Sequence, residues 1–496
     1  MAGAASTLVS WIGAVVRAHP NDPAVIYEGQ TWTYKELWQR SAVIARELLA
    51  SGVRRGEAVG LVGANEAVYI ATYFGIMRAG ATAVPLNAML DAASLRDQLV
   101  IVEARTVFVG LVDAEVRDEL SESFRTLPMG GSGEPSPRSS LPALGSSTPC
   151  SIMMTSGSTG RPKGAVHSQG TMLHAAMQLG SVFPFGSGQR GVVFLPLYAC
   201  IPEQVLPMLC MGGALEILPR FDIERVADAC SRATTFDAVP TIMGRLIEHA
   251  PLEKLAKLEW VLFASEPMPP ALLHRWWDEL PTVETHQFYG MTEILPLTAA
   301  PHWILRAEPS TVGRAFPTTR LEVQADDGSG HSDGQGELVG SSPARLLSYY
   351  NDQDATARAL SSDGAFHTGD LGRIGDDGLV YLTGRLKDVI ISGGINIAPA
   401  EIEHVACNHP DVLSAIVVGI PSERWGETPV VVAVAKPGRR LTADDILAHC
   451  RDNLSSYKRP SGAAVVPTIP VTGIGKAAKS SVRQQIMDGV IQLVRA

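Results

Sequence analysis

Short apolar segments alternate with helical patterns through most of this chain of 496 residues. In the first part, residues 24–33 predict a hairpin, residues 34–50 a helix, residues 59–62 a buried strand and residues 68–78 a second helix. The same alternation resumes from residue 165 to about residue 320. Because parallel strands need crossover helices, this pattern predicts an α/β fold with mostly parallel sheets covered by helices.

A change of pattern near residue 386 divides the chain. A chain of this length is expected to form more than one domain. We predict a large domain over residues 1–386, built from two βα-sheet subdomains and a small β-rich subdomain. Beyond it, residues 387–496 predict a small α+β domain. Its expected helices are 400–407 and 443–454, and its expected strands are 412–420 and 430–435.

The net charge and the cysteines exclude several classes of function. A net charge of −10 leaves no basic excess for binding nucleic-acid phosphates. Six scattered cysteines without a CxxC pair indicate reduced thiols rather than a zinc site or a disulfide framework. Residues 8–16 have helical spacing without a preceding basic segment, which argues against a signal peptide. No apolar run reaches membrane-span length, so we expect a cytoplasmic protein. A monomer or a homodimer is expected.

The segment 155–164 reads T-S-G-S-T-G-R-P-K-G and follows an apolar run. Glycines let backbone N–H groups converge on one point, and hydroxyls and cations offset phosphate charge. A Gly/Ser linker is the alternative, but the strand-like flanks argue against it. The segment is not a Walker A sequence, because Gly164 follows Lys163. The residues expected to bind nucleotide are Thr155, Ser156, Gly157, Ser158, Thr159, Gly160 and Lys163.

These ten residues resemble the phosphate loop of the adenylate-forming superfamily. That superfamily comprises acyl-CoA synthetases, adenylation domains of peptide synthetases, and luciferases. Four further segments match the family pattern in the same order, over nearly the whole chain. The resemblance to the acid–CoA ligase branch implies an AMP-forming enzyme that uses ATP, Mg²⁺ and coenzyme A.

The second segment, 287–293, runs from an apolar strand into a glycine turn, a hydroxyl and a carboxylate. An exposed Tyr289 beside Gly290 can stack on a nucleobase, Thr292 can donate to a phosphate, and Glu293 can hold Mg²⁺. Taken alone, Tyr289 would more often be a half-buried core aromatic and Glu293 a surface charge. The resemblance implies instead the adenine and metal motif, with Thr292 and Glu293 in catalytic roles.

Two segments resemble parts of the family that contact the nucleoside. Ser265, Glu266 and Pro267 resemble the loop beside the adenine, where the family more often has Gly at position 265. Residues 367–372 are expected to form a turn between strands, where an aspartate is usually a turn former. The resemblance implies that Asp370 accepts hydrogen bonds from both ribose hydroxyls, a task that suits two carboxylate oxygens. Arg385 matches an arginine that also contacts the ribose.

The remaining matches lie toward the C-terminus. Lys387 stands at the family's hinge between domains. Gly393 and Gly394 resemble the segment that lines the passage for a thiol arm; a hairpin turn is the other interpretation, and both can hold. Lys476 would ordinarily be a solvated charge, but it matches the family's catalytic lysine, although Thr472 replaces a common arginine nearby. The resemblance implies that rotation about Lys387 exchanges Lys476 for the two glycines between half-reactions.

The expected acid pocket departs from the family pattern. Tyr198 is followed by Ala199, which stands where many relatives have a histidine. Glu203 lies in the segment that lines the pocket in relatives, and a buried carboxylate there would need a partner such as an amine or hydroxyl of the substrate. Exposure of Glu203 to solvent at a helix start is slightly favoured. Phe288 and Met291 complete the expected pocket, and an aryl, medium-chain or functionalised acid fits it equally.

The resemblance implies two half-reactions. A carboxylate attacks the α-phosphorus of ATP and expels pyrophosphate, while Lys476 stabilises the developing charge. A thiol then attacks the acyl-adenylate, and AMP leaves. Coenzyme A is the expected acceptor, and a carrier-protein thiol is the alternative. A non-catalytic nucleotide-binding protein and a luciferase-type oxygenase are further alternatives; Glu293, Asp370, Arg385 and Lys476 argue against the first, and nothing in the sequence requires oxygen chemistry.

Overall fold

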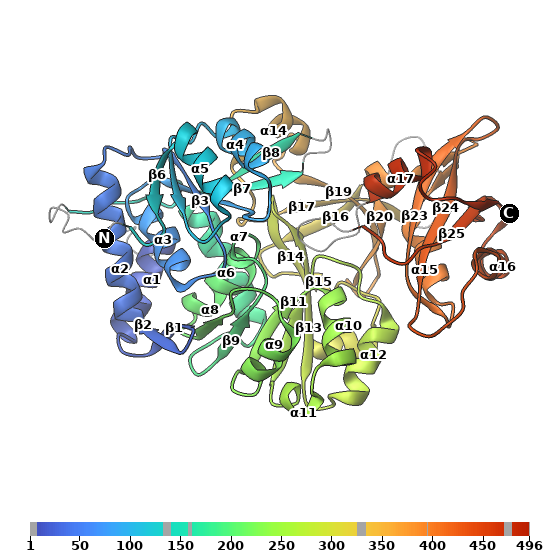
Figure 1. Ribbon diagram of the computed structural model, residues 1–496, viewed down its shortest axis with the longest axis horizontal. Helices are drawn as coiled ribbons and strands as arrows, with labels where there is room; N and C mark the ends of the chain where they lie inside the picture. Colours follow the sequence, from blue (N-terminus) through green and yellow to red (C-terminus); the bar gives the residue numbers. More distant parts are fainter. Residues whose placement is uncertain are drawn as a thin grey trace. The chain divides into compact units, whose positions relative to one another are not determined.

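The computed structural model describes residues 7–131, 140–156, 161–324, 334–393, 395–470 and 479–495. The chain forms two compact units (Figure 1). The N-terminal unit comprises Met1–Leu321, Gly340–His367 and Gly378–Val380, and the C-terminal unit comprises Glu322–Val339, Thr368–Asp377 and Tyr381–Ala496. This division groups most of the β-rich segment with the C-terminal unit, whereas the boundary at residues 386/387 stays a prediction.

The first sheet of the N-terminal unit has the strand order β15-β14-β13-β12-β11-β9-β10-β1-β2. The strands from β13 to β1 run parallel, and β2, β14 and β15 are added antiparallel. Their bounds are β1 Pro23–Tyr27, β2 Gln30–Thr33, β9 Arg190–Val193, β10 Ala214–Ile217, β11 Thr235–Ala238, β12 Trp260–Phe263, β13 Glu284–Met291, β14 Ile294–Ala300 and β15 Arg314–Ala315.

The second sheet of this unit has the order β18-β8-β7-β4-β3-β5-β6. The strands from β7 to β6 run parallel, and β8 and β18 are antiparallel to their neighbours. Their bounds are β3 Ala58–Val62, β4 Thr82–Leu86, β5 Thr106–Val109, β6 Arg125–Pro128, β7 Pro149–Ser156, β8 Pro162–Ser168 and β18 Ser348–Tyr349. The predicted α/β class with mostly parallel sheets is therefore confirmed.

Local sequence explains why these elements form where they do. The β1–β2 hairpin turns through Glu28 and Gly29, whose φ angles of 46° and 78° match a turn that preserves strand twist. Helix α2 (Tyr34–Ala50) begins at a capping box, in which the Thr33 hydroxyl accepts from the Glu36 N–H and the Glu36 carboxylate accepts from the Thr33 N–H. Helix α3 (Ala67–Arg78) is followed by Gly80 at φ 79°, a left-handed conformation that favours glycine.

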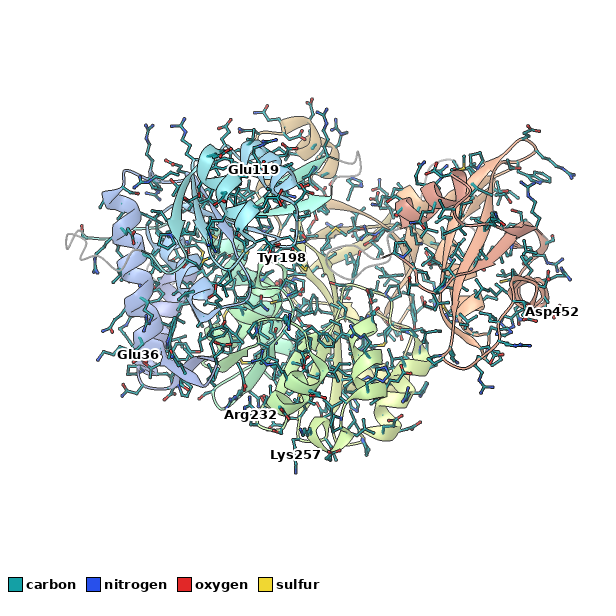
Figure 2. The ribbon with its side chains drawn as sticks, viewed as in Figure 1. Glu36, Glu119, Tyr198, Arg232, Lys257 and Asp452 are labelled. Carbon is teal, nitrogen blue, oxygen red and sulfur yellow. The ribbon has the colours of Figure 1, made fainter. Side chains whose placement is uncertain are left out.

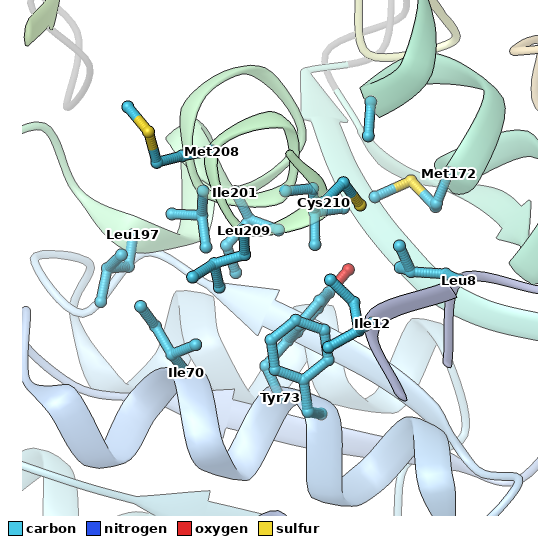
Figure 3. Close-up of a cluster of buried hydrophobic side chains, with 14 of the residues drawn as sticks. Leu8, Ile12, Ile70, Tyr73, Met172, Leu197, Ile201, Met208, Leu209 and Cys210 are labelled. Atoms are coloured by element: carbon cyan, nitrogen blue, oxygen red, sulfur yellow. The ribbon is translucent and has the colours of Figure 1, made fainter. Parts of the chain in front are cut away.

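One hydrophobic cluster joins strands of both sheets to the helices of the N-terminal unit. Figure 3 shows part of it, with Leu8 and Ile12 from α1, Tyr73 from α3, Met172 from α6 and Leu209 from α8. The remaining helices have the following bounds: α1 Leu8–Ala18, α4 Ala92–Ile101, α5 Ala114–Ser123, α6 Gln169–Val182, α7 Leu197–Cys200, the π-helix η1 Ile201–Val205, α8 Leu206–Cys210, α9 Ile223–Cys230, α10 Pro240–His249, α11 Leu252–Leu255, α12 Pro270–Glu279, α13 His302–Ala307 and α14 Gln353–Ala359.

Two sheets account for the remaining strands. One has the order β16-β17-β19-β20, and the other has the order β22-β21-β24-β25-β26 with β23 paired to β24. Their elements are β16 Arg320–Gln324, β17 Gln335–Ser341, β19 Phe366–Ile374, β20 Val380–Arg385, the 3-10 helix η2 Leu386–Asp388, β21 Ile390–Ser392, β22 Ile395–Ile397, α15 Pro399–Cys407, β23 Val412–Ser422, β24 Gly426–Ala435, α16 Ala443–Asn453, the 3-10 helix η3 Ser456–Lys458, β25 Gly462–Val465, α17 Lys479–Met487 and β26 Val494–Arg495.

The predicted elements of the C-terminal region are confirmed within a few residues by α15, β23, β24 and α16. The expectation that residues 367–372 form a turn is wrong, because they lie inside β19. Burial alternates along β19 with a period of two, as in a strand with one buried face, and Asp370 falls on that buried face. None of the helices in the described residues combines the length and the apolar character that crossing a membrane requires.

Candidate active site

The predicted phosphate loop lies between β7 and β8 of the seven-stranded sheet. The two strands pair antiparallel with Thr155 opposite Lys163 and Ser156 opposite Pro162, so the loop is the tip of a hairpin. The Thr155 hydroxyl lies 3.5 Å from the Lys163 carbonyl oxygen, across the base of that tip. Gly157, Ser158, Thr159 and Gly160 lie outside the described residues. The structure therefore places the two ends of the expected loop on adjacent strands.

A second group of residues connects this hairpin to Glu293. The Tyr349 hydroxyl donates a hydrogen bond to Glu293 Oε1 at 2.9 Å, and Lys163 Nζ lies 5.3 Å from the centre of the Tyr349 ring. Tyr349 reaches this place because β18 pairs with β8, with Tyr349 opposite Ala165. Burial, followed by the Glu293 charge, raises the pKa of Tyr349, so its hydroxyl stays protonated and acts as the donor.

The turn that carries Thr292 and Glu293 is held from two sides. It joins β13 to β14. His167 of β8 donates from Nε2 to the Thr292 carbonyl oxygen at 2.8 Å, and the Leu346 N–H donates to the Glu293 carbonyl oxygen at 2.7 Å. His167 is 3% exposed, and burial lowers its pKa to about 4, so the ring is neutral near pH 7. These contacts fix the backbone of the turn independently of the two side chains.

The residues predicted beside the adenine lie on strand ends of the nine-stranded sheet. Tyr289 is 8% exposed, so the expectation of an exposed ring is wrong and the core-aromatic interpretation describes its burial better. Gly290 lies within β13 rather than in a turn, and a Cβ there would come within 3.1 Å of the Ile294 carbonyl oxygen. Glycine at this position therefore allows β14 to approach closely.

The loop after β12 carries the three looser matches. Ser265 has a φ of 74°, a left-handed conformation that favours glycine, which explains why glycine is common at the matching family position. The Glu266 carboxylate accepts hydrogen bonds from the Thr241 hydroxyl at 2.8 Å and from the Thr241 N–H at 3.2 Å, and so satisfies an N–H in the first turn of α10. Pro267 is exposed beside it.

The predicted ribose contacts lie in the C-terminal unit. Arg385 Nε forms an ion pair with Asp370 Oδ1 at 2.8 Å, and Asp370 is almost fully buried. The Asp370 N–H donates to the Thr368 hydroxyl, which in turn donates to the Leu338 carbonyl oxygen. The structure thus brings the two predicted ribose-binding residues together. The ion pair with Arg385 orients the Asp370 side chain, and the hydrogen bonds of Thr368 hold its backbone in β19.

The residues of the predicted hinge and thiol passage come directly after Arg385 in the sequence. Lys387 lies exposed in η2, and β21 and β22 form an antiparallel hairpin with Ser392 opposite Ile395. Gly393 begins the turn of that hairpin with a φ of 59°, and its N–H donates to the Trp425 carbonyl oxygen at 2.8 Å. A Cβ at Gly393 would lie 2.8 Å from Trp425 Cε3. Gly394 and Lys476 lie outside the described residues.

The predicted acid-pocket residues on the helical side lie in one continuous segment. Tyr198 (labelled in Figure 2) and Ala199 belong to α7, and Glu203 belongs to η1. Glu203 lies in the first turn of η1 and is half-buried, so the helix-start part of the favoured expectation is confirmed and only its full exposure to solvent is not. Burial, followed by the charge of Glu203, raises the pKa values of Cys200 and Asp237. Burial also raises the pKa of Tyr198 to about 12.

A buried asparagine positions the start of this segment. Asn65 Nδ2 donates to the carbonyl oxygens of Leu195 and Leu218, and Asn65 Oδ1 accepts from the Leu197 N–H at 2.8 Å. On the strand side, Phe288 is 2% exposed in the core that also contains Leu197, and Met291 is half-buried at the end of β13. The segment and β13 are therefore parts of one packed region.

The arrangement suits a magnesium ion that is held mainly by phosphates. Within the described ranges, no group of three or more His, Cys, Asp or Glu side chains could form a protein cage for a metal ion. Mg²⁺ in phosphate-transfer sites is commonly bound by one or two carboxylates and by substrate phosphates. Glu293, oriented by Tyr349, fits that requirement.

Sequence reasoning missed three residues that the structure places at this site: His167, Tyr349 and Asn65. His167 lies four residues after Lys163 on β8, which was a local signal for proximity to the loop. Tyr349 and Asn65 carried no local signal, because their partners lie 56 and more than 100 residues away in the sequence.

Comparison with known proteins gives consistent matches over nearly the whole chain. The profile of the AMP-binding enzymes matches residues 13–350, and that of the AMP-binding enzyme C-terminal domain matches residues 401–476. A feruloyl-CoA synthase from an Amycolatopsis species is 34% identical, with 96% of this chain and 99% of the relative covered. An indoleacetate–CoA ligase from Aromatoleum aromaticum is 33% identical, with 97% and 98% covered.

A solved structure supports the same likeness. The crystal structure of ATP-bound MatB from Rhodopseudomonas palustris superimposes with a TM-score of 0.89 at 25% identity, covering 97% of this chain and 99% of MatB.

Proposed function

The chain belongs to the AMP-binding enzyme family, and from that premise we propose how its residues carry out acid–CoA ligation. It is an AMP-forming acid–CoA ligase: it converts a carboxylic acid and ATP to an acyl-adenylate and pyrophosphate, and then transfers the acyl group to coenzyme A with release of AMP. The roles of individual residues and the identity of the acid are our proposals.

One observation carries the proposed residue roles. A hydrogen bond links Tyr349 to Glu293, a cation–π contact links Lys163 to Tyr349, and His167 ties Thr292 to the same hairpin. We assign Lys163 and Thr155 to the β- and γ-phosphates, with Thr292 donating to the phosphate chain. A cation and a carboxylate held a fixed distance apart by a tyrosine form a preorganised electrostatic site, which is the arrangement that phosphoryl chemistry requires.

Glu293 is the proposed protein ligand for Mg²⁺. The ion, when bound, neutralises phosphate charge and orients the phosphates of ATP. The Tyr349 hydrogen bond orients the Glu293 carboxylate, and Lys163 adds positive charge 5.3 Å from the centre of the same ring. Asp370, oriented by Arg385 and by its own strand, is the proposed acceptor for the ribose hydroxyls.

We also propose that the two half-reactions use different parts of the C-terminal domain. Lys476 acts in adenylation, and the Gly393-Gly394 turn serves the thiol in the second step. Lys387 lies at the exposed start of the C-terminal domain, in a short 3-10 helix that can absorb a change of backbone angles. The left-handed φ of Gly393 and its closeness to Trp425 support a position where a side chain would obstruct a narrow passage.

The acid is proposed to be aromatic. Feruloyl-CoA synthase and indoleacetate–CoA ligase act on aromatic acids, and both match almost the whole chain. In this chain Tyr198 on α7 and the buried Phe288 on β13 are the aromatic side chains among the predicted acid-pocket residues, and Ala199 is smaller than the histidine common at its position in relatives.

A pyrophosphate-exchange assay with a panel of aromatic and aliphatic acids tests these roles. We expect exchange of labelled pyrophosphate into ATP only when a suitable acid is present, and formation of AMP and an acyl-CoA of the expected mass once coenzyme A is added. A phosphopantetheinylated carrier protein in place of coenzyme A identifies the preferred thiol. Glu293→Gln should abolish exchange, whereas Glu253→Gln, on the exposed first turn of α11, should not. Full exchange by Glu293→Gln would contradict the assignment.

A further inference from the structure

Asp237 is a buried carboxyl group that the residue roles above do not use. It lies on β11 at the centre of the nine-stranded sheet, and 2% of its surface is exposed. Its Oδ2 atom is fully buried and has no hydrogen-bond partner among the described residues. Leaving such a group unpaired in the interior is costly, so a buried polar atom of this kind needs an explanation in terms of a ligand or a function.

The sheet register shows which side of the sheet Asp237 faces. It pairs with Leu262 of β12, which pairs in turn with His286 of β13, so the three side chains project from one face. Phe288 follows His286 by two residues and projects from the same face. Leu262 and Phe288 pack in the cluster that contains Leu197, Cys200 and Val205. Asp237 therefore faces the helical segment that carries the proposed acid-pocket residues.

Polar groups of that segment gather around the same place. Burial raises the pKa values of Asp237 and Cys200, and the charge of Glu203 adds to both shifts. A Cβ at Gly191 of β9 would lie 3.7 Å from both Gln204 Nε2 and Thr235 Cγ2, and Thr235 is two residues before Asp237 on the same face of β11. The Gln204 amide N–H donates to the Val192 carbonyl oxygen, and its Oε1 is a second buried acceptor without a partner in the described part of the chain.

Two buried oxygens without hydrogen-bond partners, one on Asp237 and one on Gln204, indicate that a polar partner comes from outside the protein. Burial is the main cause that raises the pKa of Asp237, followed by the charge of Glu203, so the uncharged carboxyl is favoured until a donor arrives. A hydroxyl or an ammonium group can donate to such an acceptor. A purely apolar tail cannot, and would leave the acceptors unpaired.

We infer that Asp237 is a specificity-determining residue that receives a hydrogen-bond donor on the tail of the acid substrate, with Glu203 and Gln204 as its polar surroundings. The preferred acid therefore carries a hydroxyl or ammonium group at the end remote from the carboxylate. This inference rests on the proposed function and names the substrate class of the same site. Its physical basis is that a site built to pair a substrate hydroxyl discriminates strongly against the analogue that lacks it.

Matched acids test the inference. The probes are 3-phenylpropanoate and its ring-substituted analogues that carry a hydroxyl or an aminomethyl group at the meta or para position. We expect kcat/KM for pyrophosphate exchange to favour at least one donor-bearing acid over the unsubstituted acid by about tenfold or more. Preference for the hydroxyl over the aminomethyl acids would show that the substrate binds to an uncharged Asp237 carboxyl. The reverse preference would show that it binds to an ionised carboxylate.

Two variants test whether Asp237 causes the preference for donor-bearing acids. Asp237→Leu should remove it, because a similar-sized apolar side chain leaves nothing for the donor to pair with. Thr235→Val, on the same strand and the same face, is the matched control and should retain it. Calorimetric titration of each acid in the presence of a non-hydrolysable ATP analogue provides a binding readout that is independent of turnover.

The thermal stability of Asp237→Leu is a second, independent measurement. Replacing an unpaired buried carboxyl by an apolar group should leave the unfolding temperature unchanged or raise it. A large decrease would show that Asp237 has a partner within the fold and would overturn the inference, as would equal kcat/KM values for the matched acids or a preference that survives in Asp237→Leu. Absence of exchange with every acid tested would instead contradict the proposed function itself.

Discussion

The Tyr349 hydroxyl donates to the Glu293 carboxylate across 2.9 Å, while the Lys163 ammonium lies 5.3 Å from the centre of the same ring. The phenol thus stands between the cation of the expected phosphate hairpin and the carboxylate proposed to hold Mg²⁺. Lys163 and Glu293, which lie next to Tyr349 in space, are both far from it in the sequence. The pairing of β18 with β8 brings it to the hairpin, and the turn after β13 brings Glu293 to it.

Removing this hydroxyl should weaken the metal site without removing it. Tyr349→Phe keeps the ring but loses a hydrogen bond to a charged group, which is worth about 1.5–3 kcal/mol. We expect kcat/KM for ATP in pyrophosphate exchange to fall by about tenfold or more and the half-saturating Mg²⁺ concentration to rise. Tyr350→Phe is the matched control, because its hydroxyl lies beside Glu103 at 3.5 Å. Equal effects of the two substitutions would contradict the role of Tyr349.

The buried His167 should make the N-terminal unit less stable in acid. Its pKa in the folded protein is about 4, below the unfolded value of about 6.5, so the unfolded chain binds more protons between these values. The contribution of neutral His167 is therefore complete above about pH 6.5 and is lost as the pH falls toward about 4. His167→Gln cannot titrate and keeps an amide donor for the Thr292 carbonyl oxygen.

Thermal unfolding measured from pH 7 to pH 4 tests this linkage. His167→Gln should lose less stability on acidification than the wild type. Part of the pH dependence should remain, because the pKa of His286 is also lowered to about 4. If the stability of His167→Gln and that of the wild type changed equally with pH, His167 would bind protons equally in the folded and unfolded states.

Asp370 should determine how strongly the ribose hydroxyls are recognised. Asp370→Asn removes one charged acceptor and its ion pair with Arg385. With ATP, 2′-deoxyATP and 3′-deoxyATP as substrates, we expect the wild type to prefer ATP by about tenfold or more and the variant to lose most of that preference. Asp376→Asn, at an exposed turn after β19, should behave as the wild type. An unchanged preference in Asp370→Asn would place the ribose elsewhere.

Gly393 and Lys476 should affect different half-reactions. Gly393→Ala introduces a Cβ 2.8 Å from Trp425 Cε3 at a left-handed φ of 59°, so it should slow thioester formation and spare pyrophosphate exchange. Lys476→Ala should cripple exchange and spare thiolysis of a supplied acyl-adenylate. Adding Trp425→Ala to Gly393→Ala should recover the part of the loss that is steric. Equal loss of both steps in both single variants would contradict the division of roles.

The sequence predicted the class of the fold and most of the elements well, because these depend on local patterns. Apolar periodicity located α2, α3, β3 and the C-terminal α15 and α16 to within a few residues. The resemblance of short motifs supplied the family, which the comparisons confirm. The expected turn around Asp370 failed because an aspartate next to a glycine is a local turn signal, whereas the pairing of β19 in a sheet decided its conformation.

Glu203 and Asp237 mark what only the tertiary structure decided. By itself, the sequence determined that this chain alternates strands and helices, carries a Gly/Ser-rich segment at residues 155–164 and places a glutamate shortly after α7. A charged side chain at a helix start is usually solvated, and no local pattern reveals that this one is half-buried in a π-helical turn. Side chains more than 30 positions apart meet only through strand register and helix packing, so the chemistry of the proposed acid pocket would follow from long-range contacts rather than from any single motif.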